Sequence, residues 1–379
     1  MRKAQTALFA SVLLALSLLL AACGSPVTTP NAYSRGEVTE PLTLWASEDT
    51  PLAAAISELA ARYQEQEPLR PVTVKLFPTE GQMLDALSEE KPDLLLCSDR
   101  GLLCLREESA LRSLAFSAES APRFFPAFEE AAAETGTGFY PLGANVPVLV
   151  LSEKNRTLLR NSESVEELCS AASAYAASRD KAFFGMASYS RFFAEAMAQR
   201  GFSFHAQKEL DRKSEVYREI YNLLAGAAFD GGLRPETAAV LESVRSGELV
   251  CAVCELRELK EAERRELMVL PVPPMAGCEP LNYAEYWGIA AVGNGENTEA
   301  AARFVSWLCT YDHASALVLE SGLLPSGDGN WARSAGAYSE GLREVAGQIR
   351  FMTWSEDSEW VLYGEDFDRS FGEALALLS

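Results

Sequence analysis

Apolar runs and helix-like spacings of apolar residues alternate along the first third of the chain. The runs at 42–45, 72–76 and 94–97 predict strands, and the run at 94–97 is typical of a strand covered on both faces. After the first run, Leu52, Ile56 and Leu59 fall on one face of a predicted helix. Strands that alternate with helices predict a parallel sheet flanked by helices.

A similar pattern recurs over residues 282–326. Tyr283, Tyr286 and Trp287 precede an apolar run at 288–292, which predicts a buried strand. Asn297 then begins a predicted helix, and a shorter helix ends at Gly322.

The middle of the chain predicts further elements of both kinds. Residues 140–151 are interpreted as a loop that enters a strand, and Ser190 as the cap of a helix that follows a strand at 182–187. A helix is predicted over 235–246, and others over 332–349 and 366–378.

The first residues have the pattern of an export signal. Arg2 and Lys3 precede an apolar stretch, and Leu20-Ala21-Ala22-Cys23 matches the bacterial lipobox. The match implies a signal peptide over 1–22, cleavage before Cys23 and acylation of its thiol. Residues 23–41 would then be a flexible tether, and the protein would be extracytoplasmic and anchored to the cell membrane.

Composition and motifs exclude several classes of function. The net charge of −21 disfavours nucleic acid as a partner, and two histidines leave little scope for a zinc site. No nucleophile elbow or phosphate-binding glycine loop occurs. Cys251 and Cys254 lie in a strand-like run that directs them to opposite faces, so we expect no redox pair.

Two segments near the end of the chain resemble a known family. The stretch from Asn297-Thr298-Glu299 to Phe304, and Ser321-Gly322-Leu323-Leu324-Pro325, are similar to motifs of the family 1 extracellular solute-binding proteins of ABC importers, the maltodextrin-binding-protein-like cluster. Trp45, Tyr63, Pro92-Asp93 and Asp99 also follow the order of that family. Lys154 is retained from a Tyr-Asn-Lys signature whose first two residues are lost.

The resemblance implies an α/β, two-lobe, type II periplasmic-binding-protein-like fold with mostly parallel sheets flanked by helices and joined by crossing segments. The lobes would comprise 42–143 with 286–321 and 148–280 with 326–379. The function implied is capture of a carbohydrate between closing lobes and delivery to permease subunits. This function requires no catalysis, cofactor or metal, and we expect a monomer.

Candidate ligand contacts lie at predicted strand ends and lobe crossings. Ligands of open α/β sheets bind beyond the carboxyl ends of strands, and sugars require aromatic platforms and hydrogen-bonding side chains. Asp99 could instead only cap a helix, and Tyr189 could serve packing. The candidates are Ser47, Glu48, Asp99, Asn145, Tyr189, Tyr286, Trp287 and Trp331.

Three alternatives remain open from the sequence. The solute could be a polyamine, a metal chelate or a phosphorylated sugar. The many carboxylates also allow a surface glycosidase. A sensory lipoprotein without transport is the third alternative.

Overall fold

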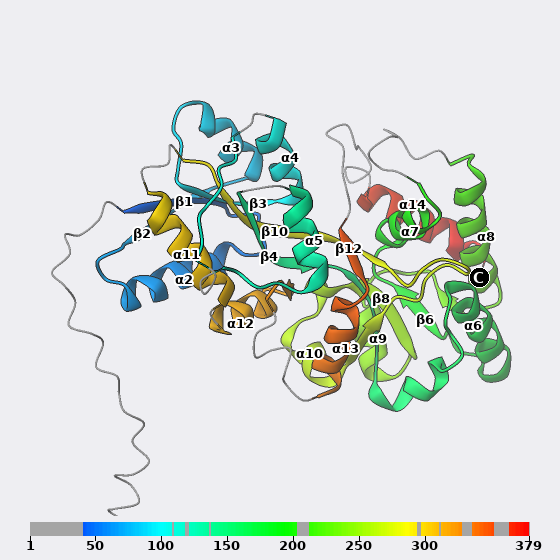
Figure 1. Ribbon diagram of the computed structural model, residues 1–379. Coiled ribbons are helices and arrows are strands. Elements are labelled where there is room, and N and C mark those ends of the chain that lie inside the picture. Colours follow the sequence, from blue (N-terminus) through cyan, green and yellow to red (C-terminus); the bar gives the residue numbers. More distant parts are fainter. Residues whose placement is uncertain are drawn as a thin grey trace, which may run out of the picture. The chain divides into compact units, whose positions relative to one another are not determined.

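Two mixed β-sheets, each covered by helices on both faces, organise the protein (Figure 1). The structure is a computed structural model that describes residues 41–107, 110–117, 121–135, 138–202, 212–293, 297–310, 312–327, 336–351 and 364–378. The predicted signal peptide, Cys23, the tether up to residue 40, and Trp331 lie outside these residues. Within them, no helix is both long and apolar enough to cross a membrane.

The first sheet organises the N-terminal lobe. Its strands run in the order β11-β4-β10-β3-β1-β2, and β12 pairs with β10. The strands are β1 (Leu42–Ser47), β2 (Val72–Phe77), β3 (Leu94–Ser98), β4 (Phe139–Asn145), β10 (Asn282–Ala291), β11 (Leu324–Pro325) and β12 (Ile349–Phe351).

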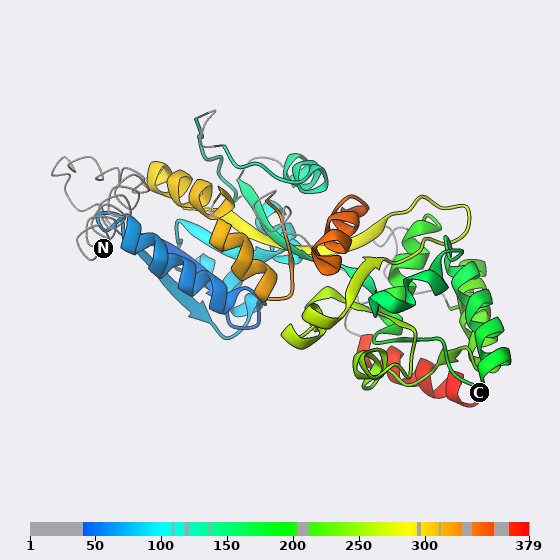
Figure 2. The same cartoon turned by 90° about the horizontal axis from the view of Figure 1, so that it is seen from below.

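Helices cover the two faces of this sheet in two groups. Because side chains alternate along β1 and β3, Leu44 and Leu96 face one group, and Trp45 and Leu95 face the other. Figure 2 shows the first group side by side on one face. The first group comprises α2 (Ala53–Gln66), α11 (Thr298–Thr310) and α12 (Asp312–Glu320), and the second α3 (Glu80–Asp85), α4 (Asp99–Glu107) and α5 (Pro126–Thr135).

The second sheet organises the C-terminal lobe. Its order is β7-β6-β8-β5-β9. The strands are β5 (Pro147–Leu151), β6 (Phe184–Met186), β7 (Leu233–Arg234), β8 (Cys251–Glu255) and β9 (Met268–Pro271).

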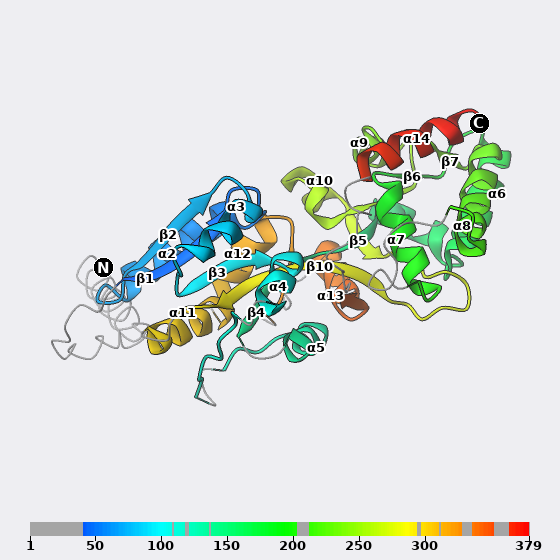
Figure 3. The ribbon, with the colours of Figure 1, turned by 90° about the horizontal axis from the view of Figure 1, so that it is seen from above.

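The second sheet is likewise covered on both faces. One face packs on α6, α7, α8 and α14, and α14 contacts α7 and α8. Figure 3 shows these helices around strands β5, β6 and β7. The other face packs on α9 and α13, with α10 beside α9. The bounds are α6 (Val165–Arg179), α7 (Tyr189–Gln199), α8 (Glu215–Phe229), α9 (Val240–Ser246), α10 (Glu261–Glu266), α13 (Ala337–Ala346) and α14 (Gly364–Ala376), with 3-10 turns η1 (Ala86–Ser88), η2 (Glu153–Leu159) and η3 (Leu256–Glu258).

Several expectations from the sequence need correction. The sheets are mixed rather than mostly parallel, because β4 and β5 pair antiparallel with their neighbours and β10 pairs antiparallel with β3 and β4. The segment predicted as a loop at 140–145 is part of strand β4. Ser188, not Ser190, caps α7, since its hydroxyl accepts the Arg191 backbone N–H. The helix predicted over 235–246 begins only at Val240.

Candidate functional site

The register of the first sheet brings several predicted site residues to one edge. Asn145 lies opposite Glu285, and Trp287 lies opposite Ser98, the last residue of β3. The carboxyl ends of β3 and β4 therefore meet the crossing strand β10 at this edge. Asp99 follows Ser98 directly and begins α4.

The end of β1 reaches the same edge of the sheet. Ser47 is buried there, and the Glu48 backbone N–H donates to the Phe77 carbonyl while its side chain is exposed. The Glu80 carboxylate accepts the Ser98 backbone N–H and hydroxyl, both at 2.6 Å. Burial raises the pKa of Glu80, against the lowering effect of these Ser98 hydrogen bonds.

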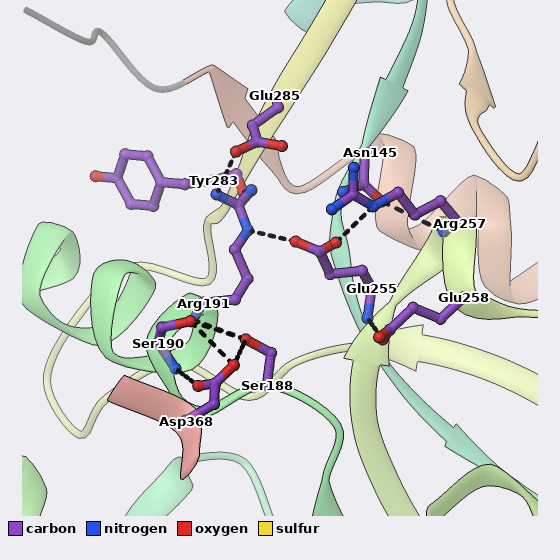
Figure 4. Close-up of polar contacts among 10 residues, drawn as sticks. All are labelled: Asn145, Ser188, Ser190, Arg191, Glu255, Arg257, Glu258, Tyr283, Glu285 and Asp368. Carbon is purple, nitrogen blue, oxygen red and sulfur yellow. Dashed lines mark hydrogen bonds and ion pairs between the residues drawn. The ribbon is translucent and has the colours of Figure 1, made fainter. Parts of the chain in front are cut away.

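Arg191 of α7 lies between the second sheet and the crossing strand (Figure 4). Its guanidinium is 3.6 Å from carboxylate oxygens of both Glu255, at the end of β8, and Glu285, in β10. It also donates to the Tyr283 carbonyl at 2.7 Å. Because the side chain is only 8% exposed, these contacts replace its hydration.

Electrostatic coupling extends from Arg191 to the N-terminal lobe. Burial lowers the pKa of Arg191, but Glu285, Glu255, Glu195 and Asp99 raise it by more, so the net shift is upward. Asp99 thus belongs to the charge cluster around a C-terminal-lobe arginine. Nearby, Ala194 of α7 packs with Tyr283 of β10 and Leu103 of α4.

Glu195 lies one helical turn after Arg191 on α7. Its Oε1 accepts the Asn282 side-chain N–H at 2.7 Å, while its buried Oε2 has no hydrogen-bond partner among the described residues. Burial raises the pKa of Glu195 to about 8, although the Arg191 charge and the hydrogen bonds from Asn282 and the Tyr283 backbone lower it. The carboxyl is therefore largely protonated at neutral pH.

A second polar group joins the end of β4, at the first crossing, to the end of β8 and the turn η3. The Asn145 Oδ1 accepts the Arg257 backbone N–H at 3.3 Å. Within the part of the chain that the structure describes, the buried Asn145 Nδ2 has no hydrogen-bond partner. The Glu255 carboxylate pairs with the Arg257 side chain at 2.8 Å, and the Glu255 backbone N–H donates to Glu258 (Figure 4). Asn145 thus offers a donor at the first crossing.

The start of α7 is held by a helix from the end of the chain. Asp368 of α14 accepts the Ser190 backbone N–H at 2.5 Å and the Ser188 hydroxyl at 3.0 Å (Figure 4). Burial raises the pKa of Asp368, against the lowering effect of these hydrogen bonds. This anchoring fixes the first turn of α7, from which Arg191 extends.

The aromatic candidates are more buried than a ligand platform requires. The Tyr286 ring packs between Phe139 and Phe351, and Trp287 belongs to the opposite core of the same lobe. A Trp287→Ala change would therefore remove core packing as well as any ligand contact. Tyr189 is fully buried, and its hydroxyl donates to the Pro235 carbonyl. Its packing role, considered as the alternative, accounts for this position.

The two cysteines of the Cys251-x-x-Cys254 motif lie on opposite faces of β8, as the alternation of side chains along a strand predicts. Cys251 belongs to the core beneath α6, α7 and α8, and Cys254 to the core on the opposite face. Burial raises the pKa of both thiols far above the ordinary range, so they stay protonated. In the described part of the chain, no three Cys, His, Asp or Glu side chains form a group that could hold a metal ion.

Sequence reasoning missed the charged residues of the C-terminal lobe. Glu255 ends a predicted strand, so the rule applied to Asp99 would have selected it. Arg191 carries a weaker signal, a charge within the apolar helical stretch 189–197. No feature of the sequence marked Glu285 as a site residue, because its partner Arg191 comes from another element.

Comparisons with known proteins address the fold. No protein-family model matches the sequence, and no curated protein matches it. Among solved structures, a family 1 extracellular solute-binding protein from Alicyclobacillus acidocaldarius matches with a TM-score of 0.72 and 14% identity, over 90% of this chain and 94% of that chain. The chain has the two-lobe fold of solute-binding proteins. This confirms the predicted fold class.

Two further matches are named as sugar binders. The sugar-binding protein MalE from Xanthomonas citri matches with a TM-score of 0.69 and 12% identity, over 88% of this chain and 92% of that chain. The cyclic alpha-maltosyl-1,6-maltose binding protein from Arthrobacter globiformis matches with a TM-score of 0.66 and 16% identity, over 91% and 95%. The names of all three matched proteins describe the binding of a sugar or another solute.

Proposed function

We propose that the protein is an extracytoplasmic solute-binding protein of an ABC importer that captures a carbohydrate between its lobes. The observation that carries this proposal is the place of Arg191, between Glu255 at the carboxyl end of β8 and Glu285 of the crossing strand β10. The charge of Asp99, at the carboxyl end of β3 in the other lobe, acts on the same guanidinium. A solute that contacts both groups would favour the closed arrangement of the lobes and shift their equilibrium.

Sugar is the preferred solute class because of the chemistry at this edge and the solved structures with the same fold. Carboxylates, a guanidinium and the Asn145 amide are the groups that bind sugar hydroxyls. Two of the matched proteins are named for binding sugars.

The lipobox at Leu20–Cys23 supports a lipid anchor on Cys23, and a Cys23→Ala variant should fail to incorporate labelled palmitate.

A cationic solute, such as a polyamine, is the second candidate. Three carboxylates act on the Arg191 guanidinium, those of Glu285, Glu255 and Asp99, whereas the nearby Glu195 carboxyl is largely protonated at neutral pH. An excess of carboxyl groups attracts cations and repels anions. The same charge argues against the phosphorylated sugar that the sequence left open.

Thermal unfolding against a solute panel tests the proposal. Protein from residue 24 onward would be melted with maltose, maltotriose, other oligosaccharides, spermidine and glucose 6-phosphate. A solute at a hundred times its dissociation constant should add about 2.7 kcal/mol to the free energy of unfolding. A shift with one neutral sugar class, without product formation, is expected. A shift with spermidine alone would replace the carbohydrate by a cation.

Two substitutions locate the binding. Asp99→Asn keeps the side-chain size and should weaken binding about tenfold or more, because charged hydrogen bonds contribute about 1.5–3 kcal/mol. Asp85→Asn is the matched control, since Asp85 is exposed at the end of α3. Equal affinity in both variants would remove Asp99 from the site.

A further inference from the structure

A half-open groove crosses the helical face of the N-terminal lobe, away from the strand ends described above. It has a volume of about 650 Å³ and lies between the last turn of α2, one side of α11 and the segment 115–117. Small-molecule sites commonly have volumes of roughly 300–1,000 Å³. The groove is therefore large enough for a solute.

The groove and the candidate site lie at opposite ends of α2. Ser47 and Glu48 precede the first turn of α2, whereas the groove contains Tyr63 and Gln66 from its last turn. A helix of this length spans about 21 Å. A solute in the groove would therefore occupy a site separate from the candidate site between the lobes, called the cleft below.

Aromatic rings form much of the wall of the groove. The Trp307 ring stacks on Phe304 at 6.3 Å between centroids and meets Tyr63 edge-on at 5.2 Å. Its indole N–H donates to the Gln66 side chain at 3.0 Å, which fixes the ring orientation. On the other side, Phe116 packs edge-on against Tyr140 at 5.3 Å. The rings are thus held before any solute arrives.

The floor and the rims of the groove are small or polar. Ala302 and Ser306 lie one turn apart on α11 and form the floor, and each is less than 10% exposed. The charges on the rims cancel in pairs, since Arg70 lies 3.9 Å from Glu67 and Arg303 lies 2.7 Å from Glu299. The groove therefore favours neither anions nor cations.

We propose that this groove is a second saccharide-binding site, distinct from the cleft between the lobes. A neutral polyhydroxyl solute fits the lining, because its apolar face can stack on Trp307 or Phe116. Its hydroxyls can bond to the side chains of Ser117, Thr310 and the paired arginines. The paired ions and hydroxyls match an oligosaccharide better than the apolar face of a partner helix.

Fluorine NMR of the protein labelled with 5-fluorotryptophan reads both sites in one spectrum. The chain has six tryptophans, and Trp307→Phe and Trp287→Phe variants assign the two informative signals. Trp307 reports on the groove, and Trp287 on the crossing strand beside the cleft. Maltotriose is the probe. We expect a saturable shift of the Trp307 signal, with an affinity independent of any Trp287 shift.

The variant Ala302→Trp fills the floor of the groove and should abolish the Trp307 response to maltotriose. Ala61→Trp makes the same change at an exposed position of α2 outside the groove and should leave the response intact. If Ala302→Trp does not fold, Trp307→Ala replaces it. Calorimetric titration with maltotriose then measures whether binding at the groove is lost.

The outcomes separate this site from the proposed transport function. A Trp307 shift without a Trp287 shift supports the groove and counts against maltotriose as the solute of the cleft. A Trp287 shift alone overturns the groove and leaves the proposed function standing. An equal Trp307 shift with sorbitol or a short polyethylene glycol shows a general solvent effect and also overturns the groove.

Discussion

Arg191 shows how one buried charge can depend on several elements at once. Its partners come from β8 and from the crossing strand β10, and its own helix is anchored by Asp368 of α14. Removal of one member of a buried ion pair leaves the remaining charge without compensation, which costs more than the pair contributes.

We predict that Arg191→Met lowers the free energy of unfolding by about 3–5 kcal/mol, because Glu285 would lose its cation and Glu255 would keep only the exposed Arg257. Urea unfolding followed by circular dichroism measures this. Arg62→Met is the control, since Arg62 forms an exposed pair with Glu58 and should change stability by less than about 1 kcal/mol. Similar values for the two variants would refute the role of Arg191.

Glu195 should make stability depend on pH. Its folded pKa of about 8 lies above the ordinary 4.5, so the folded state keeps a proton that the unfolded chain releases between these values. The stabilisation is complete below pH 4.5 and is lost as the pH rises to 8. The loss has a limiting slope of about 1.4 kcal/mol per pH unit.

We predict that Glu195→Gln, which resembles the protonated carboxyl, removes this part of the pH dependence. Its melting temperature relative to the wild-type protein should rise between pH 5 and pH 8. The exposed Glu89→Gln variant should show a constant difference over the same range. If the melting temperatures of Glu195→Gln and wild type differ by the same amount at every pH, Glu195 ionises normally.

Close approaches of the backbone decide how individual elements pack. A Cβ on Gly341 of α13 would lie 1.8 Å from the Val269 carbonyl oxygen of β9. In β10, a Cβ on Gly288 would lie 2.5 Å from the Tyr140 carbonyl oxygen of β4, beside an irregularity in the strand pairing. Glycine at these positions therefore allows contact between elements.

We predict that Gly341→Ala displaces α13 from β9 and lowers stability by at least about 2 kcal/mol. Gly226→Ala provides the opposite control within α8. Among the described residues, no atom beyond its chain neighbours and the backbone of α8 lies within 4 Å of its added Cβ, so the change should raise stability by about 0.5–1 kcal/mol. Denaturant midpoints of the two variants should shift in opposite directions. A stable Gly341→Ala variant would show that α13 can move without loss.

At the scale of the whole molecule, one hydrophobic core extends through both sheets. It contains Leu95 of β3 and Val150 of β5, joined through Ala144, Val146 and Ala284 at the crossings. Lobes that share a core lose packing together when either one unfolds.

We predict that the two lobes unfold in a single thermal transition. In scanning calorimetry, the calorimetric enthalpy should equal the van't Hoff enthalpy. Two resolved transitions would show that the crossings do not couple the lobes. A saturating solute should move the single transition upward without splitting it, since it stabilises only the folded state.

The sequence by itself determined the order and type of many elements. Alternation and helical spacing are local properties, so strands such as β1 and β3 and helices such as α2 and α11 were predictable. The strand-end rule likewise selected Ser47 and Asp99, and the predicted lobe crossing selected Asn145. The register brings these three residues to one edge. The separation of Cys251 from Cys254 also followed from alternation alone.

Only the tertiary structure decided which side chains meet. Arg191 is distant in sequence from Glu255 and Glu285, and no local pattern records their pairing. Tyr286 and Trp287 resembled ligand platforms, but the packing of neighbouring helices and strands buries them. The antiparallel pairing of β10 and the groove between α2 and α11 likewise arise from contacts between segments far apart in the chain, whose free energies depend on packing rather than on local periodicity.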